Sequence, residues 1–488
     1  MRIPIERKLI KVYPDPKRVI ARFFFNGEDR GRDLIRRVLE LTDQQIFTIL
    51  SPLLQEYSKR HRSITKLLLK HYNKVEFLFD SMDIDLEKLP AETKLLIGSY
   101  FTHEYSIESA AFFNPSVIED PDQTELEEGE RRLIISFRAV GEGHISSIVF
   151  RRALIDKNNN IHVIPVGNYI DEAEIIQTAT YDKKLFLEKA LVSRVNPEII
   201  AKLNTELSDG FDYPTLRKVI LESQKNEPDT IKDTELERVL WLTDSYYEII
   251  FSKDTDISDR VIFPISEFER KGVEDARFVK FTEDDGKVSY YATYTAYDGL
   301  LIMPKLLKTE NFYEFKIGPL FGTGAQNKNL ALFPRKINGR YAMLSRIDGC
   351  NNYIMYSDDI NIWENPIKLQ EPKYSWEFVQ IGNCGSPIET EAGWLVITHA
   401  VGPMRRYCLG ACLLKLDDPS VEIGRLDEPL LIPNPEEREG YVPNVVYSCG
   451  AIINNGELII PYGLSDYCSS FASINLKVLL QRLKGNVN

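Results

Sequence analysis

The feature that most constrains the fold is a strand–loop–strand pattern that occurs five times between residues 129 and 476. Each copy begins at a turn signal such as Asp-Gly or Asn-Gly, runs through an apolar strand with a polar residue near its end, and returns after a loop in a second strand. A chain built this way buries the apolar face of each unit against the next copy. The copies are 129–155, 285–307, 338–359, 392–416 and 455–476.

Repeats of roughly 40–60 residues made of antiparallel strands are typical of propeller blades. We therefore predict a mainly β protein, a five-bladed β-propeller, whose innermost strands carry polar side chains into one central funnel. A β-sandwich, in which each polar residue only ends a strand at the surface, is the alternative. The polar residues are Arg138, Thr295, Arg346, His399 and Tyr462.

Two regions outside the repeats have helical periodicity. Residues 1–95 are predicted to form an N-terminal helical region, in which Thr42-Asp43 could begin the second helix. Residues 171–250 are predicted to form a helical insertion within a propeller catalytic domain of residues 96–488.

Composition narrows the class of protein. The 73 acidic and 60 basic residues give a net charge of −13, which argues against a nucleic-acid partner. No stretch approaches ~18 apolar residues and the N-terminus lacks a secretory pattern, so we expect a cytoplasmic protein without a membrane partner. Six cysteines without CxxC spacing are expected to be buried free thiols, and no metal or organic cofactor is expected. The oligomeric state stays open.

Two charged motifs could carry chemistry. In the run Gly272–Arg277, an arginine follows two carboxylates, Glu274 and Asp275, and can orient one while the other transfers a proton. Lys328 and Arg346 bracket a hairpin-sized unit and could converge on one anion. The alternative for the first motif is a structural ion pair. The alternative for Lys328 and Arg346 is that they are solvated loop charges.

These segments resemble glycoside hydrolase family 130, the β-mannoside phosphorylases and β-mannosidases on a five-bladed propeller. GVEDARF, for example, resembles the GxEDPR motif of the family. The two helical regions resemble those of longer members, among them oligomannan phosphorylases that act on β-1,2 linkages. The other matching segments, in the family's order, are FFNPS, LIISFRAVGEGHISSI, NKNLALFPRKINGRYAMLSR, IGNCGSPIETEAGWLVITHAV, GYVPNVVYSCG and YGLSDYCSSFA.

The resemblance implies a role for each matched residue. Asp275 falls on the general acid, which protonates the leaving oxygen through the 3-hydroxyl of the transferred mannose. The resemblance places Asn114, Arg138 and Asp466 at the positions that hold this mannose. Further candidates for substrate binding are Glu274, Arg277 and Tyr462. The positions implied to bind inorganic phosphate, the co-substrate, are Lys328, Asn329, Arg346 and nearby His399.

Three residues depart from the family pattern. Ala276 replaces a proline, and Lys328 replaces an arginine, which keeps the charge but loses the bidentate fork. Gln380 stands where phosphorylases carry a lysine, which weakens the phosphate assignment.

The resemblance implies inverting phosphorolysis of a β-mannoside, foremost a β-1,2-oligomannoside, to α-D-mannose 1-phosphate. The family's hydrolases carry glutamate at phosphate positions, where this chain has Lys328 and Arg346. A β-mannosidase that uses Asp466 or Glu377 as its base is the second hypothesis, and a non-catalytic carbohydrate-binding propeller is the third.

Overall fold

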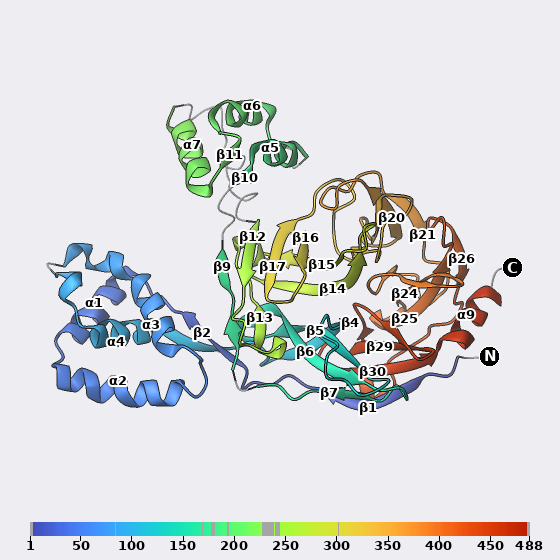
Figure 1. Ribbon diagram of the computed structural model, residues 1–488, viewed down its shortest axis with the longest axis horizontal. Coiled ribbons are helices and arrows are strands. Elements are labelled where there is room, and N and C mark those ends of the chain that lie inside the picture. The colour runs from blue at the N-terminus through green and yellow to red at the C-terminus, as the bar shows by residue number, and fades with distance from the viewer. Residues whose placement is uncertain are drawn as a thin grey trace.

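The computed structural model describes residues 3–82, 84–167, 169–176, 181–192, 195–226, 239, 245–300 and 302–485. It is a mainly β protein, in which antiparallel sheets form the body and most helices gather in two groups beside it (Figure 1). Among the described residues, no helix has both the length and the apolar character needed to cross a membrane.

Each of the five repeated segments supplies two neighbouring strands of a different antiparallel unit of four strands. The first unit contains β4 (Ala111–Glu119), β5 (Arg131–Val140), β6 (Ser146–Ile155) and β7 (Ile161–Val163), and the second contains β14 (Gly272–Thr282), β15 (Val288–Tyr297), β16 (Ile302–Thr309) and β17 (Glu314–Pro319). The third contains β18 (Ala331–Leu332), β19 (Tyr341–Ser345), β20 (Asn352–Ser357) and β21 (Ile367–Gln370). The fourth contains β22 (Gln380–Asn383), β24 (Gly393–Val401), β25 (Tyr407–Leu414) and β26 (Glu422–Arg425), and the fifth contains β27 (Val446–Tyr447), β29 (Glu457–Leu464), β30 (Cys468–Asn475) and β1 (Glu6–Val12).

Shorter strands connect or extend these units. The first two units share one sheet, because Gly272 of β14 pairs in parallel with Ser146 of β6. The second unit is extended by β12 (Tyr247–Ile250) and β9 (Glu174–Ile176), and β13 (Arg260–Ile262) joins β6 to β8 (Asp171–Glu172). The remaining strands are β2 (Val19–Phe23) with β3 (Thr102–Ser106), β10 (Tyr181–Asp182) with β11 (Gly210–Phe211), β23 (Ile388–Thr390) and β28 (Ile452–Asn454).

The first strand of the chain completes the last unit. Strand β1 pairs antiparallel with β30, with Glu6 opposite Ser473, and the two strands lie side by side in Figure 1. This pairing ties the N-terminus to the C-terminal repeat.

The polar residues predicted to lie on the innermost strand of each unit lie on the second strand of that unit. Arg138, Arg346 and His399 lie on or directly after the second strand of their units, because each unit begins one strand before its repeated segment. The first strand β4 packs against both β14 and β29. These first strands are weak signals in sequence, since β18 and β27 have only two residues each.

The hydrophobic core lies between neighbouring units, and strand β24 is an example because each of its two faces packs against a different unit. Trp394 packs its ring on Phe333 of the preceding unit, with ring centroids 5.1 Å apart. Leu395 and Ile397, on the opposite face of the same strand, join the cluster that contains Leu458 of the fifth unit. Both faces are therefore buried, which explains the continuous apolar run GWLVITHAV. The six cysteines are free thiols, as expected, and all but the partly exposed Cys350 are buried.

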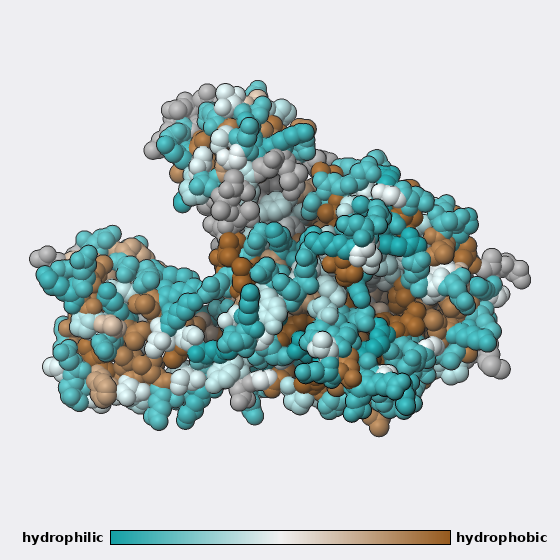
Figure 2. Space-filling view, in the orientation of Figure 1, coloured by the Kyte–Doolittle hydropathy of each residue, from teal (hydrophilic) through white to brown (hydrophobic). Residues whose placement is uncertain are grey.

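The N-terminal helical group contains α1 (Glu28–Leu39), α2 (Asp43–Tyr57), α3 (Ile64–Asn73) and α4 (Ala91–Tyr100). Thr42 begins α2 as predicted, because its hydroxyl accepts from Gln45 N–H while the Gln45 side chain accepts from Thr42 N–H. Figure 2 shows hydrophobic surface over this group of helices. Phe47 and Phe77 are among its exposed side chains.

The predicted helical block at 171–250 is wrong at both ends. Helices α5 (Lys183–Val192), α6 (Pro197–Glu206) and α7 (Tyr213–Asn226) form a second group, but β8, β9 and β12 flank it. Strand β12 is formed by Tyr247–Ile250, since aromatic and β-branched side chains favour a pleated surface. Within the predicted block, residues 227–238 and 240–244 lie outside the described residues. A last helix, α9 (Leu476–Gly485), follows β30.

Candidate active site

Two β-bulges aim Asn114 and Asp275 at each other. Each residue lies at a register shift, Asn114 in the β4–β5 pair and Asp275 in the β14–β15 pair, and each has a positive φ, 50° and 58°. Asn114 Nδ2 donates to Asp275 Oδ1 at 2.7 Å. Ser116 Oγ accepts from the backbone N–H of Phe278 at 3.1 Å, which locks the two strands together. Bulges and strained backbone of this kind re-aim side chains at functional sites.

The two carboxylates of the motif lie in a cage of cations. Arg138 Nη2 contacts Glu274 Oε1 at 2.6 Å, and Lys328 Nζ contacts Glu274 Oε2 at 2.7 Å. Arg138 Nη1 lies 3.5 Å from Asp275 Oδ1. Burial would raise the pKa of Asp275, but the charges of Arg138, Arg277 and Lys328 outweigh burial and hold that pKa below its usual value.

Tyr447 organises the other side of the cluster. Its hydroxyl accepts from Arg277 Nη2 and from Asn329 Nδ2, each at 2.8 Å, and burial raises its pKa. The His399 ring lies 4.8 Å from the Tyr447 ring, centroid to centroid. Tyr447 therefore connects the motif of the second unit to Asn329 of the third.

His399 holds Arg346. His399 Nδ1 lies 3.1 Å from the carbonyl oxygen of Asn383, which can only accept, so Nδ1 carries the hydrogen. The other ring nitrogen, Nε2, then accepts from Arg346 Nη1 at 3.2 Å. Burial, with the charges of Arg346 and Arg277, lowers the pKa of His399 well below its usual value, so the ring is neutral.

Two guanidinium groups in this cluster are buried without a carboxylate partner. Arg277 is 2% exposed and Arg346 is 8% exposed. Within the described part of the chain, neither guanidinium forms an ion pair, and the Nε atom of each has no hydrogen-bond partner. Buried charges in proteins are normally paired. The pair of cations is therefore suited to an anion supplied from outside the chain.

Asp466 is a second carboxyl group at the cluster. It follows β29 with a φ of 51°. Burial raises its pKa to about 7, Arg138 opposes this rise, and the charge of Asp275 adds to it.

The family model described as beta-1,4-mannooligosaccharide phosphorylase, that of glycoside hydrolase family 130, matches residues 239–484, half of the chain. The chain belongs to glycoside hydrolase family 130. The chain is an enzyme, and its named relatives are glycoside phosphorylases.

Named relatives include 1,2-beta-oligomannan phosphorylase of Thermoanaerobacter sp. (strain X514), which is 37% identical over 219 residues, 43% of this chain and 71% of the relative. Beta-1,2-mannobiose phosphorylase of Listeria innocua serovar 6a is 29% identical over 264 residues, 51% of this chain and 72% of the relative. A solved structure of beta-1,2-mannobiose phosphorylase from Listeria innocua, in complex with beta-1,2-mannobiose, aligns with a TM-score of 0.47 at 24% identity over 78% of this chain and 93% of that chain.

The structure of this family 130 enzyme brings most of the predicted residues into one cluster, but not Tyr462. The Tyr462 hydroxyl donates to Glu437 Oε1 at 2.8 Å, and its ring lies in the core with Leu458 and Ile460. It occupies the core face of β29 because side chains alternate along a strand. Glu377, considered above as a base, is fully buried and pairs with Arg425 at 3.2 Å, so its role is structural.

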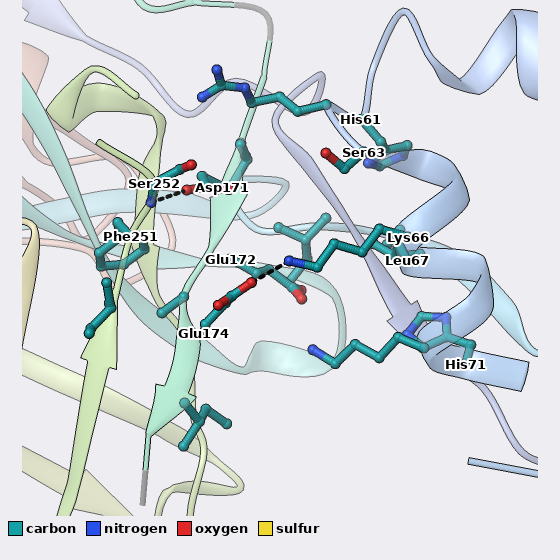
Figure 3. A pocket seen from close by; sticks show the side chains of 18 residues that line it. His61, Ser63, Lys66, Leu67, His71, Asp171, Glu172, Glu174, Phe251 and Ser252 are labelled. Carbon is teal, nitrogen blue, oxygen red and sulfur yellow. Dashed lines mark hydrogen bonds and ion pairs between the residues drawn. The ribbon is translucent and has the colours of Figure 1, made fainter. Parts of the chain in front are cut away.

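A large cavity lies elsewhere. It measures about 620 Å³ and separates α3 from β8, β9 and the end of β12 (Figure 3). Lys66 of α3 reaches across it to Glu174 of β9. The residues that line it, within the described chain, include none of the clustered residues. The cavity therefore belongs to the junction between the helical region and the sheets.

Proposed function

We propose that this enzyme is an inverting phosphorylase that cleaves β-mannosides, foremost β-1,2-oligomannosides, with inorganic phosphate and releases α-D-mannose 1-phosphate. Membership of family 130 and the names of the relatives support this substrate class. We also propose that the five antiparallel units are the blades of a five-bladed propeller, with the cluster at its axis.

The observation that carries the proposal is the pair of buried, unpaired guanidinium groups. A phosphate dianion beside Arg277 and Arg346 would neutralise the two guanidinium charges that have no carboxylate partner within the described residues, and Lys328, although paired with Glu274, adds a third cation. A phosphorylase needs such cations to hold its nucleophile in line, whereas a hydrolase needs a base to activate water. Asn329 and Tyr447 supply further polar groups beside the two arginines.

Asp275 is the general acid of the proposed reaction. A phosphate oxygen attacks the anomeric carbon from the face opposite the leaving oxygen, and the bond from that carbon to the leaving oxygen breaks. The proton passes from Asp275 through the 3-hydroxyl of the mannose to the leaving oxygen, and inversion gives the α-phosphate. The charge of bound phosphate offsets that of Lys328 and Arg277, which raises the pKa of Asp275 and favours its protonated form.

The mannose would be held by the residues that surround this acid. Asn114 and Arg138 already contact Asp275, and Asp466 lies within electrostatic reach of both Arg138 and Asp275. Their donors and acceptors therefore converge on the carboxylate through which the proton moves.

Hydrolysis is the second candidate function, and two observations favour it. Asp466, with a pKa of about 7, has the ionisation expected of a base that activates water near neutral pH. Gln380 in place of the phosphorylase lysine points the same way.

The reverse reaction separates the two functions. The purified enzyme is incubated with α-mannose 1-phosphate and mannose, and released phosphate and new disaccharide are measured together. A phosphorylase forms one β-mannosyl disaccharide for each phosphate released, and Asp275→Asn abolishes both products. Failure of the wild-type enzyme to form disaccharide, together with hydrolysis of β-1,2-mannobiose in phosphate-free buffer, would refute the proposal and select hydrolysis.

A further inference from the structure

A fully buried ion pair lies just before the motif that contains Asp275. Glu269 and Lys305 are both 0% exposed, and Lys305 Nζ lies 2.8 Å from Glu269 Oε1. Glu269 ends a short 3-10 helix, and β14 begins three residues later at Gly272. Lys305 lies on β16 of the same unit. The pair therefore belongs to the frame that holds the start of β14.

Glu269 gathers donors from several elements around it. The hydroxyl of Tyr294, on β15, donates to Glu269 Oε1 at 2.8 Å. The hydroxyl of Tyr247, on β12, lies 2.9 Å from both carboxylate oxygens. The backbone N–H groups of Ile265 and Ser266 donate to Oε2, each at 3.1 Å. One carboxylate thus joins the turn before β14 to the strands β12 and β15.

Tyr294 lies opposite the bulge that presents Asp275. The register of the β14–β15 pair shifts between Glu274 and Arg277. Two residues, Asp275 and Ala276, therefore face Tyr294 across the pair, as in other bulges of this kind. Ala276 is buried in the same hydrophobic cluster as Tyr294, while Asp275 contacts the polar residues of the site. The position of Tyr294 thus bears directly on the direction of the Asp275 side chain.

The backbone of Asp275 needs such support. Its φ is 58°, a left-handed conformation that persists only where the surrounding structure imposes it. Glu269 holds the chain on two sides of this residue. It fixes the turn that leads into β14, and through the Tyr294 hydroxyl it fixes the strand across from the bulge.

Stability alone does not account for a buried ion pair at this place. Two charges that leave water incur a large desolvation cost, and apolar residues of similar volume often replace such a pair without loss of stability. What a fully bonded charged group adds is one defined geometry, because each of its donors must lie in a fixed direction. A defined geometry is what a general acid requires.

We propose that Glu269 is a positioning residue: with Lys305 as its counter-ion and Tyr294 as its contact, it fixes the bulge that holds Asp275 against Asn114. The inference rests on the proposed function, in which Asp275 delivers the proton. Glu269 itself contacts neither phosphate nor sugar, because its carboxylate is enclosed in the second unit.

Two variants separate positioning from stabilisation. Tyr294→Phe keeps the ring and removes the hydroxyl, and it should lower kcat for phosphorolysis of β-1,2-mannobiose about tenfold with KM within about twofold of wild type. The double variant Glu269→Met with Lys305→Met removes both charges and keeps the volume. Its urea midpoint should equal or exceed that of wild type, while its kcat falls about 100-fold. A network that only stabilises the fold would give a lower midpoint and an unchanged kcat.

Tyr290→Phe is the matched control. Tyr290 is a buried tyrosine of the same strand and the same hydrophobic cluster, and it lies opposite Lys280, away from the bulge. Four residues separate it from Tyr294, so both side chains lie on one face of β15. Its kcat should stay within about twofold of wild type.

An activated substrate tests whether the lost step is proton delivery. The leaving group of 2,4-dinitrophenyl β-mannoside departs without a proton, so a displaced acid should matter little. On this substrate, Tyr294→Phe should turn over within about twofold of wild type, and Asp275→Asn should also retain activity. An equal loss by Tyr294→Phe on both substrates would overturn the inference, and so would unchanged kcat in both Tyr294→Phe and the double variant.

Asp275→Asn distinguishes failure of the inference from failure of the proposed function. If Asp275→Asn loses as much activity on the activated substrate as on β-1,2-mannobiose, Asp275 is not the acid and the proposed function fails. If it spares the activated substrate and Tyr294→Phe does not, only the inference fails. A crystal structure of the double variant needs no turnover: the 2.7 Å contact between Asn114 Nδ2 and Asp275 Oδ1 should be lost, and its retention would overturn the inference.

Discussion

Replacing Arg346 by methionine should stabilise the protein while it disables phosphate binding. Arg346 is 8% exposed, burial lowers its pKa, and its guanidinium donates to the neutral ring of His399. An uncompensated buried ion costs several kcal/mol, and methionine of similar volume removes that cost. His399 Nε2 then loses its donor, which costs about 1–3 kcal/mol. The net expectation is a gain of about 1–3 kcal/mol in the free energy of unfolding without phosphate.

Arg425 provides a matched control. It is also 8% exposed, but it pairs with the fully buried Glu377 at 3.2 Å. Arg425→Met would leave that carboxylate buried and unpaired, so it should cost about 3–5 kcal/mol. Both replacements exchange a buried arginine for methionine, but their expected effects on the free energy of unfolding have opposite signs.

Urea unfolding with and without phosphate measures both effects. Phosphate at 100 times its Kd should stabilise wild type by about 2.7 kcal/mol and Arg346→Met not at all. Arg346→Met should also lower kcat/KM for phosphate by about 100-fold or more. If Arg346→Met instead destabilised the protein as much as Arg425→Met, and phosphate stabilised it like wild type, the idea of an anion-binding buried cation would be refuted.

Three further perturbations have defined outcomes. Asp275→Asn should abolish turnover in both directions and leave phosphate binding intact by calorimetry; retained activity would remove Asp275 as the acid. Asp466 has its pKa raised from 3.8 to about 7, so it binds a proton in the folded state that the unfolded state lacks, and stability falls as pH rises between these values. Urea titrations should therefore show that wild type loses about 2–3 kcal/mol more than Asp466→Asn between pH 5 and pH 8, and equal losses would contradict the burial argument. The Lys66–Glu174 pair across the cavity is exposed on both sides, so Lys66→Ala should leave the urea midpoint of unfolding unchanged, and a clear fall would show that the pair holds the helical region in place.

The sequence predicted the cluster around Asp275, the proposed acid, because its members lie in contiguous motifs. GVEDARF contains Glu274, Asp275 and Arg277 within four residues, and the structure confirms that they lie together with Arg138. The bulge that turns Asp275 toward Asn114 could not be predicted, because it depends on pairing with strands far away in the sequence.

Tyr447 was not among the predicted site residues, although it lies in the matched segment GYVPNVVYSCG. The repeat pattern begins at the second strand of each unit, so it does not mark the first strand of the fifth unit, Val446–Tyr447. Counting back one strand from each repeat would have found it, since Asn114 and Asp275 lie on the corresponding first strands of the earlier units. Tyr462 was predicted from its place near the end of a strand. That argument did not consider that side chains alternate between the two faces of a strand.

Phosphorus NMR of the enzyme with β-1,2-mannobiose tests the central claim most directly, because it shows whether phosphate or water receives the mannosyl group. With inorganic phosphate present, we predict a signal of α-mannose 1-phosphate and one free mannose for each disaccharide consumed. In a phosphate-free tube we predict no reaction. Two free mannoses for each disaccharide in both tubes, with no phosphate ester, would contradict it.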